Sequence, residues 1–400
     1  MKFIVIGISD APLPFFPPEV LAAIRGGRVF SGGRRHHEIV APLLPAGARW
    51  VDITAPLDNV FRQYDAPEIV VFASGDPLFF GFANTIRRRM PEAEVVVYPS
   101  FNSLQLLAHR LLMPYHDMRI VSLTGRPWQA FDRALIEGVG KMGVLTDREH
   151  TPRAIARRML DYGYDHYEMH VGERLGNPAE EKLTSLTVRE AVDRDFDLPN
   201  CLILDAGEEA AARRPPYGIP DGDFGLLDGR EKMITKMPIR LLDLQALGLR
   251  GRRVLWDVGA CTGSVSIEAR LLFPHLHVDA FEIRPECEAI IHGNARRFGA
   301  PGIDVHIGDF LETDLEALPR PDAVFIGGHG GRLREIMARV QMVLADDGVV
   351  VMNSVRAPRV TLDSHRLWDE VCADQGWRQD PPTSILLNEH HPITILRCRR

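Results

Sequence analysis

Short runs rich in Val and Ile alternate with stretches of helical periodicity in the first half of the chain. A run of about four to eight apolar residues between turn residues is typical of a buried strand, and apolar residues three or four apart indicate a helix. The pattern predicts strands at Phe3–Ile6, Glu68–Ala73, Glu94–Tyr98, Arg119–Leu123 and Lys141–Leu145. It predicts helices at Ser103–Leu112, Gln129–Glu137 and Pro152–Tyr162. This alternation is that of an α/β fold.

The second half repeats the pattern more regularly. Strands are predicted at Arg253–Asp257, Leu276–Phe281, Ile303–Ile307, Asp322–Ile326 and Gly348–Met352, each followed by a helical segment. A final pair of strands is predicted at Thr383–Leu387 and Pro392–Arg397. Strand–helix units closed by a strand pair predict a doubly wound, Rossmann-like sheet.

Residues 210–229, AAARRPPYGIPDGDFGLLDG, separate the two halves. They are dense in Pro, Gly and charge and have no apolar periodicity, which is typical of a linker. We therefore expect a first domain at residues 1–209, a linker at 210–229 and a second domain at 230–400. No internal repeat is apparent, which argues against solenoids and propellers.

The composition is that of a globular protein, since 45% of the 400 residues are hydrophobic and 25% are charged. A net charge of −7 and a pI near 6.1 argue against non-specific attraction to nucleic acid or to an anionic membrane. Arg outnumbers Lys by 42 to 5. This excess fits either a GC-rich genome or a need for guanidinium groups that bind carboxylates or phosphates.

The five cysteines contain no C-x-x-C pair, so they match neither a disulfide framework nor a thiolate metal site. The start, MKFIVIGISDAPLPFF, has too short an apolar run for a signal peptide, and no long uninterrupted apolar window is present. We expect a cytoplasmic protein with no metal ion and with no nucleic-acid or membrane partner.

The segment VLWDVGACTGSVSIEA joins a predicted strand to a predicted helix through a turn that contains Gly259 and Gly263. Such a turn is a nucleotide site in many α/β proteins. Its G-x-x-x-G spacing lacks the third glycine of a dinucleotide loop, and Asp257 stands just before it. A carboxylate there would repel pyrophosphate and attract the ammonium group of S-adenosylmethionine (SAM).

Two more acids follow the next two strands, Glu282 in FEIRPE and Asp309 in GDF. A carboxylate at the second strand end can accept both ribose hydroxyls, and we expect Asp309 near the adenine amino group. Each acid alone is better explained as an ordinary strand-end residue. Three acids on successive strand ends beside a glycine turn indicate a cofactor site.

The motifs D-V-G-A-C-T-G, E-I and G-D-F resemble those of class I SAM-dependent methyltransferases, and the stretch from MITK to FIGGHGG is similar to their decarboxylating precorrin branch. The resemblance implies cofactor contacts by Thr235, Asp257, Gly259, Ala260, Cys261, Thr262, Gly263, Glu282, Asp309 and Phe310. On spacing alone, Thr235 is a simple helix-start residue. The family usually carries Gly at the position of Cys261, and we interpret this cysteine as a tolerated small residue rather than a nucleophile.

The glycine-rich loop GGHGG follows the fourth predicted strand of this half, at the edge where α/β sheets place substrates. The resembled family carries Ser at the central position. We expect Gly328 and Gly330 to let the backbone approach a large flat ligand, and His329 to move a proton near neutral pH. A histidine tolerated in a flexible loop is the alternative.

In the first half, Ser74, Gly75, Asp76 and Pro77 directly follow a predicted buried strand. With VIG, YPSFNSLQLLA, VSLTGR, VLTD and VGERLG, this turn resembles the tetrapyrrole methylase family over nearly all of residues 1–205. The resemblance implies two α/β subdomains and a second SAM site that uses Gly7, Ser74, Gly75, Asp76 and Pro77. The family's G-x-G-D-P-x-x-L-T loop is replaced here by GISDAPLPFF.

The turn GGRRHHE offers Arg34, Arg35 and His36 as partners for substrate carboxylates. A solvated basic turn explains the same residues equally well.

A tetrapyrrole methylase followed by a class I domain is the arrangement of the decarboxylating precorrin-6Y methyltransferase family. The resemblance implies that the first domain methylates the macrocycle at C-5. It implies that the second methylates C-15 and decarboxylates the ring C acetate, giving precorrin-8X in cobalamin biosynthesis. It also implies two SAM sites per chain, a tetrapyrrole substrate and a homo-oligomer.

Three other interpretations remain open at this point. The first is a SAM enzyme that acts on RNA or on another small molecule, although FIGGHGG is not an N-P-P-Y-type loop. The second is a nicotinamide dehydrogenase, against which the missing third glycine argues. The third, a non-catalytic scaffold, gives no reason for two cofactor-type turns.

Overall fold

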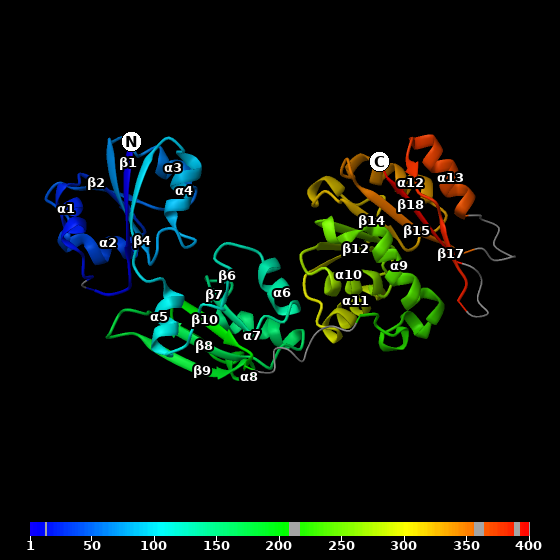
Figure 1. Ribbon diagram of the computed structural model, residues 1–400, viewed down its shortest axis with the longest axis horizontal. Helices are drawn as coiled ribbons and strands as arrows, with labels where there is room; N and C mark the ends of the chain where they lie inside the picture. Colours follow the sequence, from blue (N-terminus) through cyan, green and yellow to red (C-terminus); the bar gives the residue numbers. More distant parts are fainter. Residues whose placement is uncertain (13, 208–216, 356–363, 388–392, 400) are drawn as a thin grey trace. The chain divides into compact units, whose positions relative to one another are not determined.

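The protein is seen in a computed structural model, which describes residues 1–12, 14–207, 217–355, 364–387 and 393–399 (Figure 1). The chain forms two compact units. The first comprises residues 1–126, 140–158 and 165–209, and the second comprises residues 127–139, 159–164 and 210–400.

The first unit contains a parallel five-stranded sheet in the order β3-β2-β4-β1-β5. Its strands are β1 (Lys2–Ile8), β2 (Val29–Gly32), β3 (Arg49–Asp52), β4 (Glu68–Ser74) and β5 (Glu94–Tyr98). Its helices are α1 (Pro18–Gly26), α2 (Arg34–Val40), α3 (Leu57–Phe61) and α4 (Phe82–Arg89). Alternate residues of β1 face opposite sides of the sheet, so Phe3 and Val5 pack with α4 while Ile4 and Ile6 pack with α1.

A second sheet of this unit has the order β6-β7-β10-β8-β9, in which only β6 and β7 are parallel. Its strands are β6 (Arg119–Ser122), β7 (Lys141–Leu145), β8 (Glu168–Glu173), β9 (Lys182–Thr187) and β10 (Asn200–Asp205). The helices α5 (Ser103–Arg110) and α8 (Val188–Ala191) belong to this unit, whereas α6 (Gln129–Ile136) belongs to the second unit and α7 (Pro152–Asp161) is divided between the two at residue 158. A reciprocal cap between Asn102 and Gln105 starts α5, which buries Leu104 and Leu107 against Ile203.

The second unit is built on one sheet in the order β13-β12-β11-β14-β15-β18-β16, with β17 paired to β18. Its strands are β11 (Val254–Val258), β12 (His277–Glu282), β13 (Ile303–Ile307), β14 (Ala323–Ile326), β15 (Val349–Val355), β16 (Arg378–Gln379), β17 (Thr383–Ile385) and β18 (Ile393–Arg399). The strands β11 to β15 are parallel, and β18 runs antiparallel beside β15.

Helices cover both faces of this sheet (Figure 1). One face carries α9 (Met237–Leu247), α10 (Ser264–Leu272) and α11 (Glu286–Arg297), and the other carries α12 (Leu333–Val343) and α13 (Ser364–Gln375). On β11, Leu255 packs into the first core and Trp256 into the second, because successive side chains of a strand point to opposite faces. The second half is therefore doubly wound.

The predicted α/β fold class is confirmed, and every strand predicted from the apolar runs is present. The pattern missed β2, β3, β8, β9, β10 and β16. Strands such as β3, with the sequence RWVD, carry too few apolar residues to stand out. The helical segment expected after Ile303–Ile307 is wrong, because only a single 3₁₀ turn at Leu315–Ala317 precedes β14.

The described part of the expected linker, residues 217–229, packs into the second unit. Ile219, Phe224 and Leu227 are buried in its core. The carboxylate of Glu268 on α10 accepts hydrogen bonds from the backbone nitrogens of Gly218 and Ile219. These residues therefore do not form an exposed linker, and residues 210–216 lie outside the described ones.

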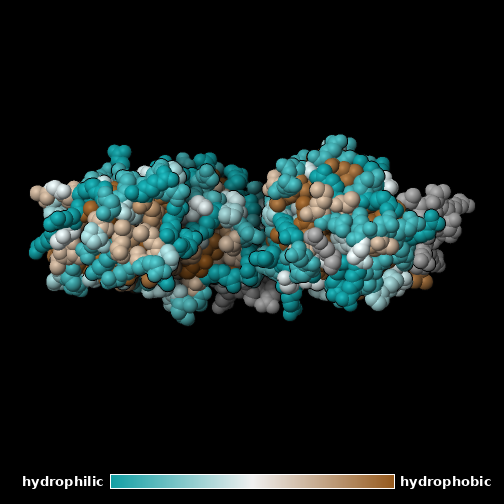
Figure 2. Space-filling view, turned by 90° about the horizontal axis from the view of Figure 1, so that it is seen from above, coloured by the Kyte–Doolittle hydropathy of each residue, from teal (hydrophilic) through white to brown (hydrophobic). Residues whose placement is uncertain are grey.

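The helices of the described residues are all too short or too polar to cross a bilayer. The face seen in Figure 2 is mostly hydrophilic, with smaller apolar areas between the polar ones.

Candidate functional site

The turn between β11 and α10 requires glycine at both predicted positions. Gly259 has a φ of 80° and Gly263 a φ of 72°, in the left-handed region that favours glycine. A Cβ atom on Gly259 would lie 2.7 Å from the backbone nitrogen of Gly328. The glycine loops after β11 and β14 therefore lie against each other at one edge of the sheet.

A pocket of about 410 Å³ opens at this edge. Its lining includes these predicted residues: Gly259, Glu282, Asp309, Phe310, Gly328, His329 and Gly330. The structure thus brings the ends of β11, β12, β13 and β14 together around one cavity, as the motif order predicted. Other predicted cofactor residues are not part of the lining: Thr235, Asp257, Ala260, Cys261, Thr262 and Gly263.

The carboxylate of Glu282, the last residue of β12, accepts more hydrogen bonds than that of Asp309, the other acid of the pocket. It accepts a hydrogen bond from the backbone nitrogen of Cys261 at 2.8 Å and is bound by the guanidinium of Arg284. Burial raises the pKa of Glu282, but the hydrogen bonds from Arg284 and Cys261 outweigh it and hold the pKa below its usual value. Glu282 is therefore an anion that faces the pocket.

Asp309 follows β13 and is bound by the fork of Arg332, with Nη1 2.8 Å from Oδ2 and Nη2 3.0 Å from Oδ1. This hydrogen bonding lowers the pKa of Asp309. Both pocket acids are thus paired with arginines from the same edge.

Asp257 lies inside β11 and not at the pocket surface. Its Oδ2 accepts hydrogen bonds from the backbone nitrogen and the hydroxyl of Ser266, and its Oδ1 has no partner among the described residues. Burial raises the pKa of Asp257 to about 6. On α9, the fully buried Asp243 accepts a hydrogen bond from Asn353 at 2.7 Å, and burial raises its pKa to about 8. The sequence did not single out Asp243 or Asn353.

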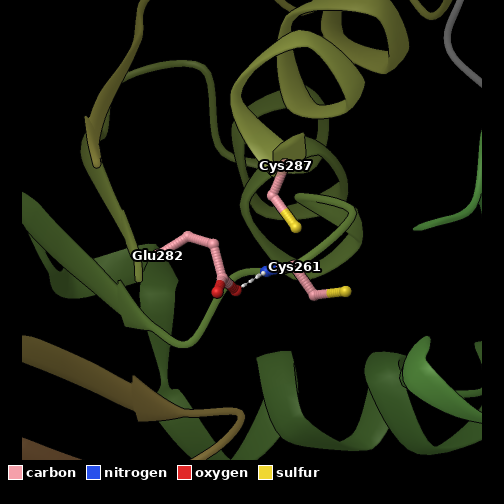
Figure 3. A group of neighbouring side chains, drawn as sticks. All are labelled: Cys261, Glu282 and Cys287. Atoms are coloured by element: carbon pink, nitrogen blue, oxygen red, sulfur yellow. Dashed lines mark hydrogen bonds between the residues drawn. The ribbon is translucent and has the colours of Figure 1, made fainter. Parts of the chain in front are cut away.

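Cys261, Glu282 and Cys287 form a group whose ligand atoms all lie within 4.8 Å of one another (Figure 3). Two thiols and a carboxylate are donors that zinc-like cations accept. Burial raises the pKa of both thiols, that of Cys287 to about 12, and so favours the protonated form over the thiolate that a metal requires. The φ of 50° at Cys261 places this side chain on a backbone that favours glycine.

His329 lines the pocket with a fixed ring orientation. Its Nδ1 accepts a hydrogen bond from the backbone nitrogen of Gly331 at 3.1 Å, so Nε2 carries the proton and donates to Ser364 Oγ at 3.2 Å. Burial lowers the pKa of His329. The ring is therefore neutral at pH 7.

Thr235 and Thr262, two further predicted cofactor residues of this half, use their backbone carbonyls in contacts within the protein. The carbonyl of Thr235 accepts a hydrogen bond from Arg240, and the carbonyl of Thr262 accepts one from Asn294. The hydroxyl of Thr262 is buried without a partner among the described residues. These residues support the turn or leave a polar atom unpaired beside it.

The first unit has its own pocket, of about 640 Å³. Ser74 and Gly75 line it together with Arg35 and His36. Gly7 is not part of the lining, but a Cβ atom there would lie 1.9 Å from the carbonyl oxygen of Gly75, so the backbones of the two predicted motifs touch.

Asp76, Pro77 and Arg34 do not line this pocket. Asp76 caps its own turn by accepting a hydrogen bond from the backbone nitrogen of Leu78. Arg34 is exposed and pairs with Glu38 at 3.2 Å on the same helix. Only the second arginine of the basic turn therefore faces the cavity.

Two family models match the chain. Residues 6–192 match the Tetrapyrrole (Corrin/Porphyrin) Methylases, and residues 228–376 match the Precorrin methyltransferase domain. A precorrin-6Y C(5,15)-methyltransferase [decarboxylating] from Sinorhizobium sp is 34% identical over 368 residues, which cover 90% of this chain and 87% of that protein. The chain belongs to the precorrin-6Y C(5,15)-methyltransferase family.

Single-activity relatives match shorter stretches of this precorrin-6Y methyltransferase family member. The cobalt-precorrin-7 C(5)-methyltransferase of Salmonella typhimurium is 31% identical over 206 residues, 50% of this chain and 98% of that protein. The cobalt-precorrin-6B C(15)-methyltransferase (decarboxylating) of the same organism is 39% identical over 129 residues, 32% of this chain and 66% of that protein. The family expected from the motifs is confirmed.

The motifs of the precorrin-6Y methyltransferase family did not reveal several charged residues of the two pockets. Arg284 stands two residues after Glu282. The chain turns sharply between them, so that the two side chains form an ion pair. Asp10 lies in the loop that departs from the tetrapyrrole methylase pattern, and Arg126 ends the VSLTGR motif. The available signal for Asp243 was an acid between leucines, in the run LLDL of α9.

Proposed function

We propose that this chain methylates precorrin-6Y at C-5 and C-15 and removes the carboxyl group of the ring C acetate, giving precorrin-8X. The observation that carries the proposal is the match to a decarboxylating C(5,15)-methyltransferase over 90% of the chain. The single-activity relatives match only 50% and 32% of the chain, whereas this relative matches both halves.

SAM is the proposed methyl donor at both pockets, and it supplies an electrophilic methyl group when bound. In the second half, Gly259, Glu282 and Asp309 would hold it. The lining fits such a ligand because Glu282 and Asp309 are ionised carboxylates beside the pocket, and because Gly259 and Gly328 bring backbone without side chains to it. In the first half, Gly7, Ser74 and Gly75 would play this part.

A precorrin is a flat molecule with many carboxylates, and both pockets offer matching groups. Arg126 lines the first pocket and lies over the ring of Phe80 at 5.2 Å. Gly328 and Gly330 leave the rim of the second pocket without side chains. Apolar and guanidinium surfaces together suit a carboxylated macrocycle.

His329 is the proposed proton relay for the decarboxylation. Breaking the bond between the acetate methylene and its carboxylate releases CO₂, leaves the electron pair on the conjugated macrocycle, and requires a proton for the methylene carbon. Nε2–H is the proton that the neutral ring can give to the methylene carbon while Nδ1 takes up another from water, a step in which Nδ1 must release the backbone nitrogen of Gly331. An unchanged decarboxylation rate in folded His329→Ala would exclude this role.

Mass spectrometry of the product tests the function. After incubation with SAM and precorrin-6Y, we expect two added methyl groups and the loss of CO₂. A product with one methyl group and an intact acetate would limit the chain to one of the two reactions. Calorimetry with S-adenosylhomocysteine is expected to give two binding events per chain, and a stoichiometry of one would contradict the second cofactor site.

A further inference from the structure

The hydroxyl of Ser74 at the end of β4 has both of its acceptor positions occupied. Nη2 of Arg35 lies 2.8 Å from Ser74 Oγ, and Nε2 of His36 lies 2.9 Å from it. A guanidinium can only donate, and a serine oxygen accepts about two hydrogen bonds. Whether His36 also donates depends on its tautomer.

The tautomer of His36 is set by its own helix start. The backbone nitrogen of Gly33 donates to Nδ1 of His36 at 3.2 Å, so Nδ1 is an acceptor and the ring proton is on Nε2. Burial, together with the positive charge of Arg35, lowers the pKa of His36 to about 4. His36 is therefore a neutral ring that donates to Ser74.

Arg35 is fixed by the loop that departs from the family pattern. Its Nη1 donates to Asp10, a carboxylate of which only 4% is exposed, and Arg174 donates to the other oxygen of Asp10 at 3.3 Å. Asp10 thus holds the guanidinium that points at Ser74. Asp10 stands at the Asp position of the family's G-x-G-D-P pattern, whose second glycine is replaced here by Ser9.

The pocket that Ser74 lines has an excess of positive charge. Its charged lining residues are Arg35, Arg126 and Asp10, since His36 is neutral. Arg126 donates to Ser122 Oγ and to the carbonyl of Thr124, and no acidic side chain pairs with it among the described residues. An anionic ligand would complete both the charge balance and the hydrogen bonding of this wall.

We propose that the hydroxyl of Ser74 donates a hydrogen bond to a carboxylate oxygen of the ligand in the first pocket. Arg35 and His36 occupy its acceptor positions, so that Ser74 can act toward the ligand only as a donor. Because both acceptor positions of Ser74 are taken by donors from α2, its O–H is left to point at the ligand. The carboxylate belongs either to the methionine part of SAM or to a side chain of the macrocycle. The inference rests on the proposed function, and it makes His36 and Asp10 positioning residues.

The test measures methylation at C-5 and at C-15 separately in the full chain, with ¹³C-methyl SAM and NMR of the product. We expect Ser74→Ala to lower kcat/KM for C-5 methylation about tenfold, the value of one charge-assisted hydrogen bond. C-15 methylation and decarboxylation should be unchanged. A rise of KM for SAM identifies the cofactor carboxylate, and a rise of KM for the tetrapyrrole identifies the substrate carboxylate.

Variants of His36 distinguish a role in positioning the Ser74 hydroxyl from a role in folding or packing alone. His36→Gln keeps an N–H donor at the position of Nε2 and should retain C-5 methylation, whereas His36→Leu should lose about as much as Ser74→Ala. His37→Gln is the matched control, because His37 is the next residue of α2, stacks on Trp50 and does not line the pocket.

The pH profile gives a second readout. The charged groups that face His36 are Arg35 from its own helix and Asp10 from the loop after β1. C-5 methylation should therefore show no His36-dependent change between pH 5.5 and 8. An imidazolium that bound the carboxylate directly would instead give activity that falls as the pH rises through about 6.5.

Two results would overturn the inference. One is a Ser74→Ala enzyme with unchanged C-5 methylation, and the other is an equal loss in His37→Gln. Absence of C-5 methylation in the unaltered protein would count against the proposed function instead, so the two failures are distinguishable.

Discussion

Arg284 binds both carboxylate oxygens of Glu282, with Nε 2.8 Å from Oε1 and Nη2 3.1 Å from Oε2. The backbone nitrogens of Arg284 and Cys261 donate to the same two oxygens. A carboxylate has about four acceptor positions, so Glu282 has none left. Ribose hydroxyls can reach it only if the guanidinium moves away.

Removing this competitor should strengthen cofactor binding to the second pocket. We expect Arg284→Ala to bind S-adenosylhomocysteine about fivefold more tightly in calorimetry, since the hydroxyls no longer displace a charge-assisted pair. The binding event that is lost in Glu282→Ala identifies the pocket. Arg296→Ala, on the exposed side of α11, is the control. Weaker binding in Arg284→Ala would show that the guanidinium contacts the cofactor itself.

The sequence predicted that these residues meet at one edge of the sheet, because the signal was local. Gly259 and Gly263 require a left-handed backbone, and a parallel sheet places the acids that follow its strands at one edge. The pairing of Glu282 with Arg284 could not be predicted, because it depends on the rotamer of a long side chain after the turn.

Contacts between distant segments were also beyond the sequence pattern. Asp243 and Asn353 are 110 positions apart and meet only because α9 packs over β15. The protonation state of His36 could not be predicted for a related reason. Its charge depends on burial and on Arg35, and composition does not reveal burial.

A second prediction concerns the backbone at Cys261, where φ is 50°. Glycine adopts this conformation without the cost of about 1 kcal/mol that a Cβ atom brings. We compare Cys261→Gly with Cys261→Ala, since both remove the thiol. The glycine variant should be the more stable by about 1 kcal/mol in urea unfolding, although alanine is the more stable residue at ordinary positions. Equal stability of the two variants would mean that the turn is unstrained.

Asp243 gives a prediction about pH. Its pKa is raised from 3.8 to about 8 in the folded state, so the folded protein retains a proton that the unfolded chain loses. This contribution to stability is fully present below the unfolded pKa and is lost as the pH rises toward 8. We expect Asp243→Asn, which needs no proton, to be more stable than the unaltered protein by at least about 1 kcal/mol at pH 8.

The difference between the two proteins should shrink toward pH 4, because Asp243 is then protonated in the unfolded chain as well as in the folded protein. Chemical denaturation across this range measures it. The same difference at both ends would show that Asp243 is not desolvated. Asp346→Asn, at an exposed carboxylate, is the control for a general effect of removing one negative charge.

The last prediction concerns the ion pair that attaches residues 217–229 to the second unit. Nε of Arg240 lies 2.7 Å from Glu268 Oε2, and neither side chain is more than 1% exposed. Arg240→Met leaves the carboxylate buried without its countercharge, so we expect the free energy of unfolding to fall by about 3 kcal/mol. The double variant Arg240→Met/Glu268→Gln should lose less than Arg240→Met alone, since no buried charge remains and the amide oxygen can still accept from Gly218 and Ile219.

Urea unfolding of the full chain measures the stability of the unaltered protein and of both variants, with Arg250→Met as an exposed control. A double variant as unstable as Arg240→Met would show that packing of the arginine stem, rather than the uncompensated carboxylate, accounts for the loss.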